Sequence, residues 1–101
     1  MELEKPKQNH FTIYSKSGCK NCVKVKNFLS SKQLSVHIID CDDYLIESKI
    51  EFLAFIKEYT KQDVKQFPIV FSNDTFIGGY DETVNYINKL NQLEESCFSN
   101  I

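Results

Sequence analysis

The order of apolar patterns along the chain limits its fold more than any other feature. Alternating β-forming residues predict a strand over 10–15, a helical repeat of apolar residues follows over 19–32, and a second strand pattern covers 35–41. After two helix-starting aspartates, a second helical pattern runs from 42 to 60. Strand, helix, strand and helix in this order predict a parallel α/β unit.

The second half of the chain predicts a different arrangement. Two short strand patterns, 68–71 and 75–77, flank Ser72-Asn73-Asp74, which suits a tight turn between antiparallel strands. Gly78-Gly79 ends the second strand, and a last helical pattern begins near residue 80. The order βαβ followed by ββα is that of the thioredoxin fold. We therefore predict an α/β protein whose four-stranded mixed sheet is flanked by helices.

The length of the chain decides its domain organisation. A chain of 101 residues can build one compact core but not two. Residues 1–9 are polar and show no apolar periodicity, and the last helical pattern fades into polar residues. We predict a flexible N-terminal arm over 1–9, one domain over 10–94 and a polar C-terminal tail over 95–101.

Charge and hydropathy exclude several classes of partner. The net charge is -2, and all twelve basic residues are lysines, so nothing indicates a nucleic-acid partner. No apolar run reaches the length of a membrane span, and the first residues are charged where a secretory signal would be apolar. We expect a monomer with no nucleic-acid or membrane partner, working in the cytoplasm.

The cysteines carry the strongest chemical signal. Cys19 and Cys22 lie where the first predicted strand meets the first helix. The positive end of a helix and its free N–H groups stabilise a thiolate at Cys19, and Lys16 and Lys20 add positive charge. Cys22 lies one turn further in, close enough for a disulfide with Cys19. The spacing predicts Cys19 as the attacking thiolate and Cys22 as its partner.

A zinc site is the alternative interpretation of two cysteines at this spacing. Such a site needs two more ligands at comparable spacing. The other candidates are spread over two strands and the tail and form no second pair; they are His10, His37, Cys41 and Cys97. We therefore predict redox chemistry and no metal site.

Three blocks of sequence together resemble the glutaredoxin family. The blocks are Tyr14 to Cys22, Phe67 to Phe71 and Ile77 to Glu82, in the family's order and at its spacing. The resemblance covers residues 10–93. It implies a glutathione-dependent thiol-disulfide oxidoreductase that reduces glutathione mixed disulfides and protein disulfides. Its partners would be glutathione, as reducing co-substrate, and glutathionylated or disulfide-containing proteins, with no bound cofactor.

The resemblance also implies a groove for glutathione. Pro68 corresponds to the family's cis-proline, and the backbone of Phe67 would pair with a peptide-like substrate. A Gly-Tyr-Asp element at the start of the last helix matches the part that holds one end of glutathione. Lys16 matches a lysine that pairs with the other carboxylate. The residues of this predicted groove are Lys16, Phe67, Pro68, Gly79, Tyr80 and Asp81.

Departures from the family pattern keep two other functions open. Lys20 and Asn21 replace the proline and the aromatic residue that usually separate the two cysteines of dithiol members. One alternative is an iron-sulfur carrier, in which Cys19 from two subunits and two glutathiones hold a cluster. The other is a thioredoxin-like protein disulfide reductase that does not use glutathione.

Overall fold

The computed structural model describes residues 2–99, and side chains over residues 2–90. The strands are β1 (Phe11–Ser15), β2 (Val36–Asp40), β3 (Ile69–Ser72) and β4 (Thr75–Gly78). The helices are α1 (Lys20–Ser31), α2 (Asp42–Glu47), α3 (Lys49–Thr60) and α4 (Tyr80–Ser99). The predicted order, βαβ followed by ββα, is confirmed.

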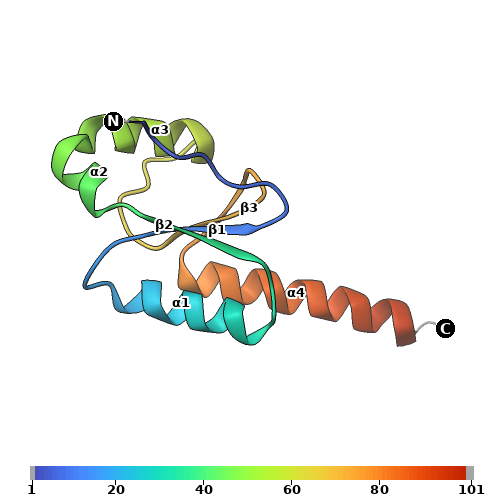
Figure 1. The fold of residues 1–101 in the computed structure, drawn as a ribbon. Helices are drawn as coiled ribbons and strands as arrows, with labels where there is room; N and C mark the ends of the chain where they lie inside the picture. The colour runs from blue at the N-terminus through green and yellow to red at the C-terminus, as the bar shows by residue number, and fades with distance from the viewer. Residues whose placement is uncertain (1, 100–101) are drawn as a thin grey trace.

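The four strands form one mixed sheet in the order β2-β1-β3-β4. Strand β1 pairs parallel with β2 and antiparallel with β3, and β3 pairs antiparallel with β4. Figure 1 shows α1 and α4 on one face of the sheet and α2 and α3 on the other. This is the predicted α/β architecture with helices on both faces.

Alternation along β1 builds the two halves of the core. Ile13 and Tyr14 are both fully buried, but successive residues of a strand point to opposite faces of the sheet. Ile13 packs with Val25 of α1, whereas Tyr14 packs with Phe52 of α3. A central strand covered on both faces therefore holds the start of α1 against the sheet.

The predicted helix over 42–60 is interrupted at Ser48. The backbone of Ser48 leaves the helical region, with φ −142° and ψ 39°, and this residue ends α2 and begins α3. Serine favours helix ends because its side chain competes with the helical backbone for hydrogen bonds. Ile46 and Ile50, on either side of the break, are 81% and 85% exposed.

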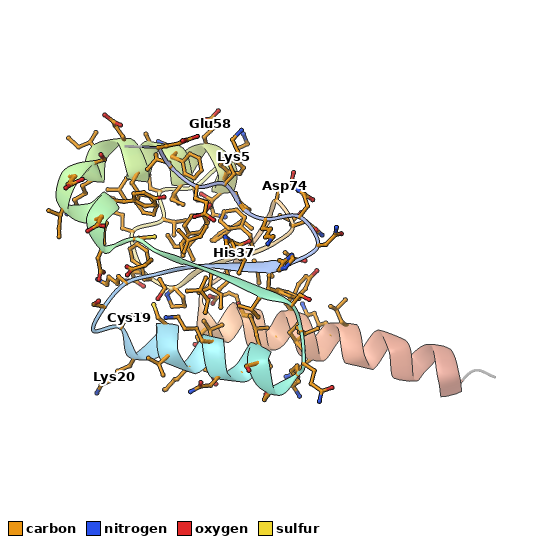
Figure 2. All side chains as sticks on the ribbon, viewed as in Figure 1. Lys5, Cys19, Lys20, His37, Glu58 and Asp74 are labelled. Atoms are coloured by element: carbon orange, nitrogen blue, oxygen red, sulfur yellow. The ribbon has the colours of Figure 1, made fainter. Side chains whose placement is uncertain are left out.

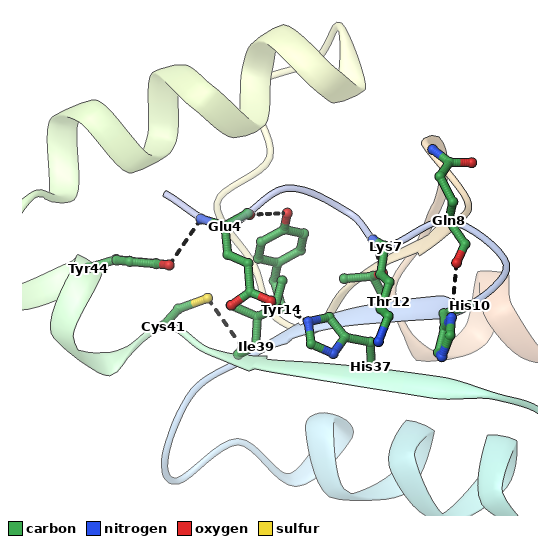
Figure 3. Close-up of polar contacts among 10 residues, drawn as sticks. All are labelled: Glu4, Lys7, Gln8, His10, Thr12, Tyr14, His37, Ile39, Cys41 and Tyr44. Carbon is green, nitrogen blue, oxygen red and sulfur yellow. Dashed lines mark hydrogen bonds and ion pairs between the residues drawn. The ribbon is translucent and has the colours of Figure 1, made fainter. Parts of the chain in front are cut away.

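Within the range predicted as a flexible arm, residues 1–9, the segment around Glu4 packs on the domain. Figure 3 shows Tyr14 donating a hydrogen bond to the carbonyl oxygen of Glu4, at 2.7 Å. The N–H of Glu4 donates to the hydroxyl of Tyr44, and its carboxylate contacts His37. Leu3 packs on the core beneath. The segment is held by backbone hydrogen bonds, one carboxylate and the Leu3 side chain, and hydrophobic periodicity does not reveal these contacts.

The last helix also extends further than predicted. It continues through Ser99, into the predicted polar tail, because the sequence from 80 to 99 contains no glycine or proline to end it. Figure 1 shows its C-terminal half projecting beyond the sheet. The side chain of Cys97 lies outside the described side chains. Over residues 2–99, no helix combines the length and apolar character that a membrane span requires.

Candidate active site

Cys19 occupies the N-cap position of α1. Its backbone is extended, with φ −104° and ψ 107°, and its Sγ accepts a hydrogen bond from the N–H of Cys22 at 3.2 Å. Gly18 makes the turn before it with φ +71°, a conformation that glycine adopts without strain. Figure 2 shows Cys19 at the start of α1, below the loop that follows β1. The N-cap position places this sulfur at the positive end of the helix, next to its free N–H groups.

The start of β3 lies directly against Cys19. The Sγ of Cys19 donates to the carbonyl oxygen of Phe67 at 3.6 Å, and the Phe67-Pro68 peptide bond is cis. Two segments that are far apart in sequence therefore meet at the Cys19 sulfur.

Cys22 differs from Cys19 in exposure. Its side chain is only 1% exposed, whereas Cys19 is half-buried. Burial raises the pKa of the Cys22 thiol, and its contact with Cys19 raises this pKa further. Both cysteines are free thiols, as is Cys41. The buried Cys22 therefore favours the protonated thiol, whereas solvent can reach the sulfur of Cys19.

A hydrogen-bonded carboxylate fixes the loop between β1 and α1. The N–H of Ser17 donates to Oδ1 of Asp42 at 2.9 Å, and the Ser17 hydroxyl donates to the other oxygen of the same carboxylate. These hydrogen bonds lower the pKa of Asp42. The sequence indicates Asp42 as a helix-starting residue, and the structure shows that it also holds the loop that leads to Cys19.

A groove of about 680 Å³ opens beside the start of β3, within the size range of small-molecule sites. Every predicted groove residue except Lys16 lines it. Tyr80 and Asp81, at the start of α4, line this groove together with Phe67 and Pro68. Lining residues outside the predicted set are Asn21, Gln62, Asp63, Val64, Lys65, Gln66, Phe76, Ile77, Gly78 and Glu82.

Lys16 lies at the other side of the reactive loop. Its Nζ stands 5.6 Å from the centre of the Phe67 ring, a cation-π distance. Lys16 lines a second hollow next to Cys19 and is not among the residues lining the groove. The Phe67 ring, which lines the groove, is therefore the contact that links Lys16 to the groove.

A protein-family model described as Glutaredoxin matches residues 11–77 of the chain. The chain belongs to the glutaredoxin family. The matched region includes Cys19, Cys22 and Pro68 but ends before Gly79 and Asp81. Comparison with curated protein sequences gives no match.

Solved structures of glutaredoxins share this fold. A glutaredoxin from Francisella tularensis, complexed with cacodylate, has a TM-score of 0.70 and 22% identity, covering 82% of this chain and 96% of that one. A buckwheat glutaredoxin-glutathione complex has a TM-score of 0.62 and 25% identity, covering 78% and 68%. A dithiolic glutaredoxin from Trypanosoma brucei brucei has a TM-score of 0.64 and 21% identity, covering 86% and 84%.

In this glutaredoxin, Glu82 closes the N-terminus of α4. The N–H of Gly79 donates to Oε1 of Glu82 at 2.7 Å, and the hydroxyl of Thr83 donates to the carbonyl oxygen of Gly79. An acidic residue that reaches back from the third helical position is the capping-box arrangement, and this spacing is visible in the sequence. One N–H at the predicted carboxylate end of the groove is thus already bound by the protein's own carboxylate.

Over the described side chains, no three His, Cys, Asp or Glu residues gather as a metal site. Cys41 is fully buried, and burial raises the pKa of its thiol to about 12. His37 contacts Glu4 of the N-terminal segment.

Proposed function

We propose that this glutaredoxin is a glutathione-dependent thiol-disulfide oxidoreductase that reduces glutathione mixed disulfides and protein disulfides. The observation that carries the proposal is the position of Cys19, a solvent-reachable sulfur at a helix N-cap, beside a groove of tripeptide size. The buckwheat relative in complex with glutathione supports glutathione as the ligand.

The two cysteines would divide the reaction. The Cys19 thiolate attacks a glutathione mixed disulfide, the other thiol leaves and takes up a proton, and a disulfide between Cys19 and glutathione forms. A second glutathione thiolate then attacks the glutathionyl sulfur, which releases glutathione disulfide and restores Cys19. On a protein disulfide, the Cys19 thiolate attacks one sulfur, the other protein cysteine leaves and takes up a proton, and a mixed disulfide between Cys19 and the protein forms. Cys22, whose sulfur lies within reach, then gives up its proton and attacks the Cys19 sulfur; the remaining protein cysteine leaves as a thiol and the Cys19-Cys22 disulfide forms. Two glutathiones then reduce the Cys19-Cys22 disulfide.

The groove would hold glutathione by its two charged ends. Asp81 offers a carboxylate to the ligand's ammonium group, and the start of α4 offers N–H groups to the neighbouring carboxylate. The backbone of Phe67 pairs with the peptide part, next to Pro68. Lys16 would reach the other carboxylate across the Phe67 ring.

A coupled assay tests the proposal. Purified protein, glutathione, glutathione reductase and a small mixed disulfide of glutathione should give sustained NADPH oxidation. Turnover with thioredoxin reductase but none with glutathione would instead identify a thioredoxin-like reductase. Free thiols must be maintained for this chemistry, so we place the activity in a reducing compartment.

Cluster reconstitution tests the iron-sulfur alternative, which Lys20 favours by standing where dithiol members usually have proline. Reconstitution under anaerobic conditions should leave a colourless monomer if the chain is an oxidoreductase. Stable visible absorbance together with a dimer would favour the carrier function.

A further inference from the structure

Cys19 lines a second hollow, which is distinct from the groove proposed for glutathione. The groove is lined by the segment before β3, by β4 and by the start of α4. On the other side of Cys19, a hollow of about 650 Å³ is formed by the β1–α1 loop, the first turns of α1 and the edge strand β2. Cys19 and Cys22 both line this second hollow.

The second hollow exposes large apolar side chains. Val23 of α1 is 55% exposed and Ile38 of β2 is 49% exposed, and both line it. Single exposed apolar residues are ordinary on protein surfaces. Here two of them, from different elements, lie in one concave site with the reactive cysteine. Apolar surface concentrated in this way is typical of a binding site.

Positive charge borders the same hollow. Lys16, Lys20 and Lys26 line it, and Asp40 is the one carboxylate among its described lining residues. Figure 2 shows Lys20 next to Cys19, at the open end of the α1 helix. The hollow therefore suits a ligand that combines apolar side chains with carboxylates.

The shape of a protein substrate supplies such a ligand. Glutathione continues for only one residue on each side of its cysteine, but a protein cysteine bonded to Cys19 continues as polypeptide in both directions. One flank can pair with the backbone of Phe67 in the groove, and the other must leave across the opposite side of Cys19. We infer that the second hollow binds this other flank, and that the preferred protein substrates carry apolar and acidic residues there. The inference rests on the proposed function.

Single-turnover kinetics test the docking site. The pre-reduced protein is mixed with a disulfide-linked peptide whose cysteine is flanked by leucine and glutamate, or by serine and lysine, and no glutathione is present. The double variant Ile38→Ser/Lys26→Glu should lose about tenfold in rate on the Leu/Glu peptide and prefer the Ser/Lys peptide. Ile50→Ser/Lys49→Glu, which changes an exposed Ile and Lys at the start of α3, should match the wild type.

A small glutathione mixed disulfide separates docking from chemistry. All three proteins should turn it over equally, because none of the four substituted residues is among those proposed to hold glutathione. A matching loss on the small disulfide would show damage to the cysteine site and overturn the inference, as would an unchanged rate on the Leu/Glu peptide. Absence of glutathione turnover in the wild type would instead overturn the proposed function. The peptide experiment contains no glutathione, so its rates would still test whether the second hollow binds the peptide. A wild-type dimer that the Ile38→Ser/Lys26→Glu variant abolishes would assign the hollow to a second copy of the chain.

Discussion

At the scale of single residues, the environment of each cysteine determines how fast it reacts relative to the other cysteines. Cys19 is half-buried at a helix N-cap, whereas burial raises the pKa of Cys22 and of Cys41. Because the thiolate is the reactive form, iodoacetamide at neutral pH should modify Cys19 at least about tenfold faster than either buried cysteine. Time-resolved peptide mapping by mass spectrometry measures this order. Equal labelling of Cys41 in the native protein would contradict the described burial.

The same burial predicts how stability depends on pH. Burial raises the folded-state pKa of Cys41 to about 12, above the value of about 8.5 for a free thiol, so the folded state holds this proton more tightly. This contribution to stability is complete below about pH 8.5 and is lost progressively as the pH rises toward 12. Burial also raises the pKa of Tyr14 and of Cys22, with the same sign.

Urea unfolding between neutral pH and about pH 11 measures this effect. The free energy of unfolding should fall as the pH rises. Cys41→Ala should be less stable at neutral pH, because it opens a cavity, but should show a shallower fall. An equally steep fall in the variant would remove Cys41 from the explanation.

At the scale of elements, α2 holds the loop that positions the nucleophile. The carboxylate of Asp42 accepts two hydrogen bonds from Ser17, two residues before Cys19. Asp42→Ala removes both acceptors, so kcat/KM on a small disulfide should fall by up to about tenfold, with little change in Tm because the pair is exposed. Asp43→Ala, at the neighbouring exposed position, is the matched control. Full activity in Asp42→Ala would show that the loop holds its shape without this carboxylate.

The start of α4 makes a separate prediction for glutathione binding. Glu82 binds the N–H of Gly79 at the end of the groove where a ligand carboxylate is expected. Glu82→Gln keeps an acceptor for that N–H but removes the negative charge, so KM for glutathione should fall about two- to tenfold. Glu58→Gln, on the exposed surface of α3, controls for net charge. A raised KM in Glu82→Gln would mean that its carboxylate helps to bind the ligand.

At the scale of the whole molecule, local patterns in the sequence predict the sheet and the reactive cysteines. The apolar pattern of β1 and the two cysteines at the start of a helix are local features, so they can be predicted from the sequence alone. The break at Ser48 and the packing of Glu4 against Tyr14 and Tyr44 depend on contacts between distant segments. The hydrogen bond between Ser17 and Asp42 also joins distant segments, and the sequence near either residue does not predict it.

The division of labour between the two cysteines is the central claim, and paired cysteine variants test it most directly. Cys22→Ser should retain turnover of a glutathione mixed disulfide, lose most reduction of a protein disulfide, and carry one glutathione on residue 19 by mass spectrometry. Cys19→Ser should lose both activities. Normal turnover in Cys19→Ser, or glutathione attached to Cys97 in Cys22→Ser, would contradict the assignment of Cys19 as the nucleophile.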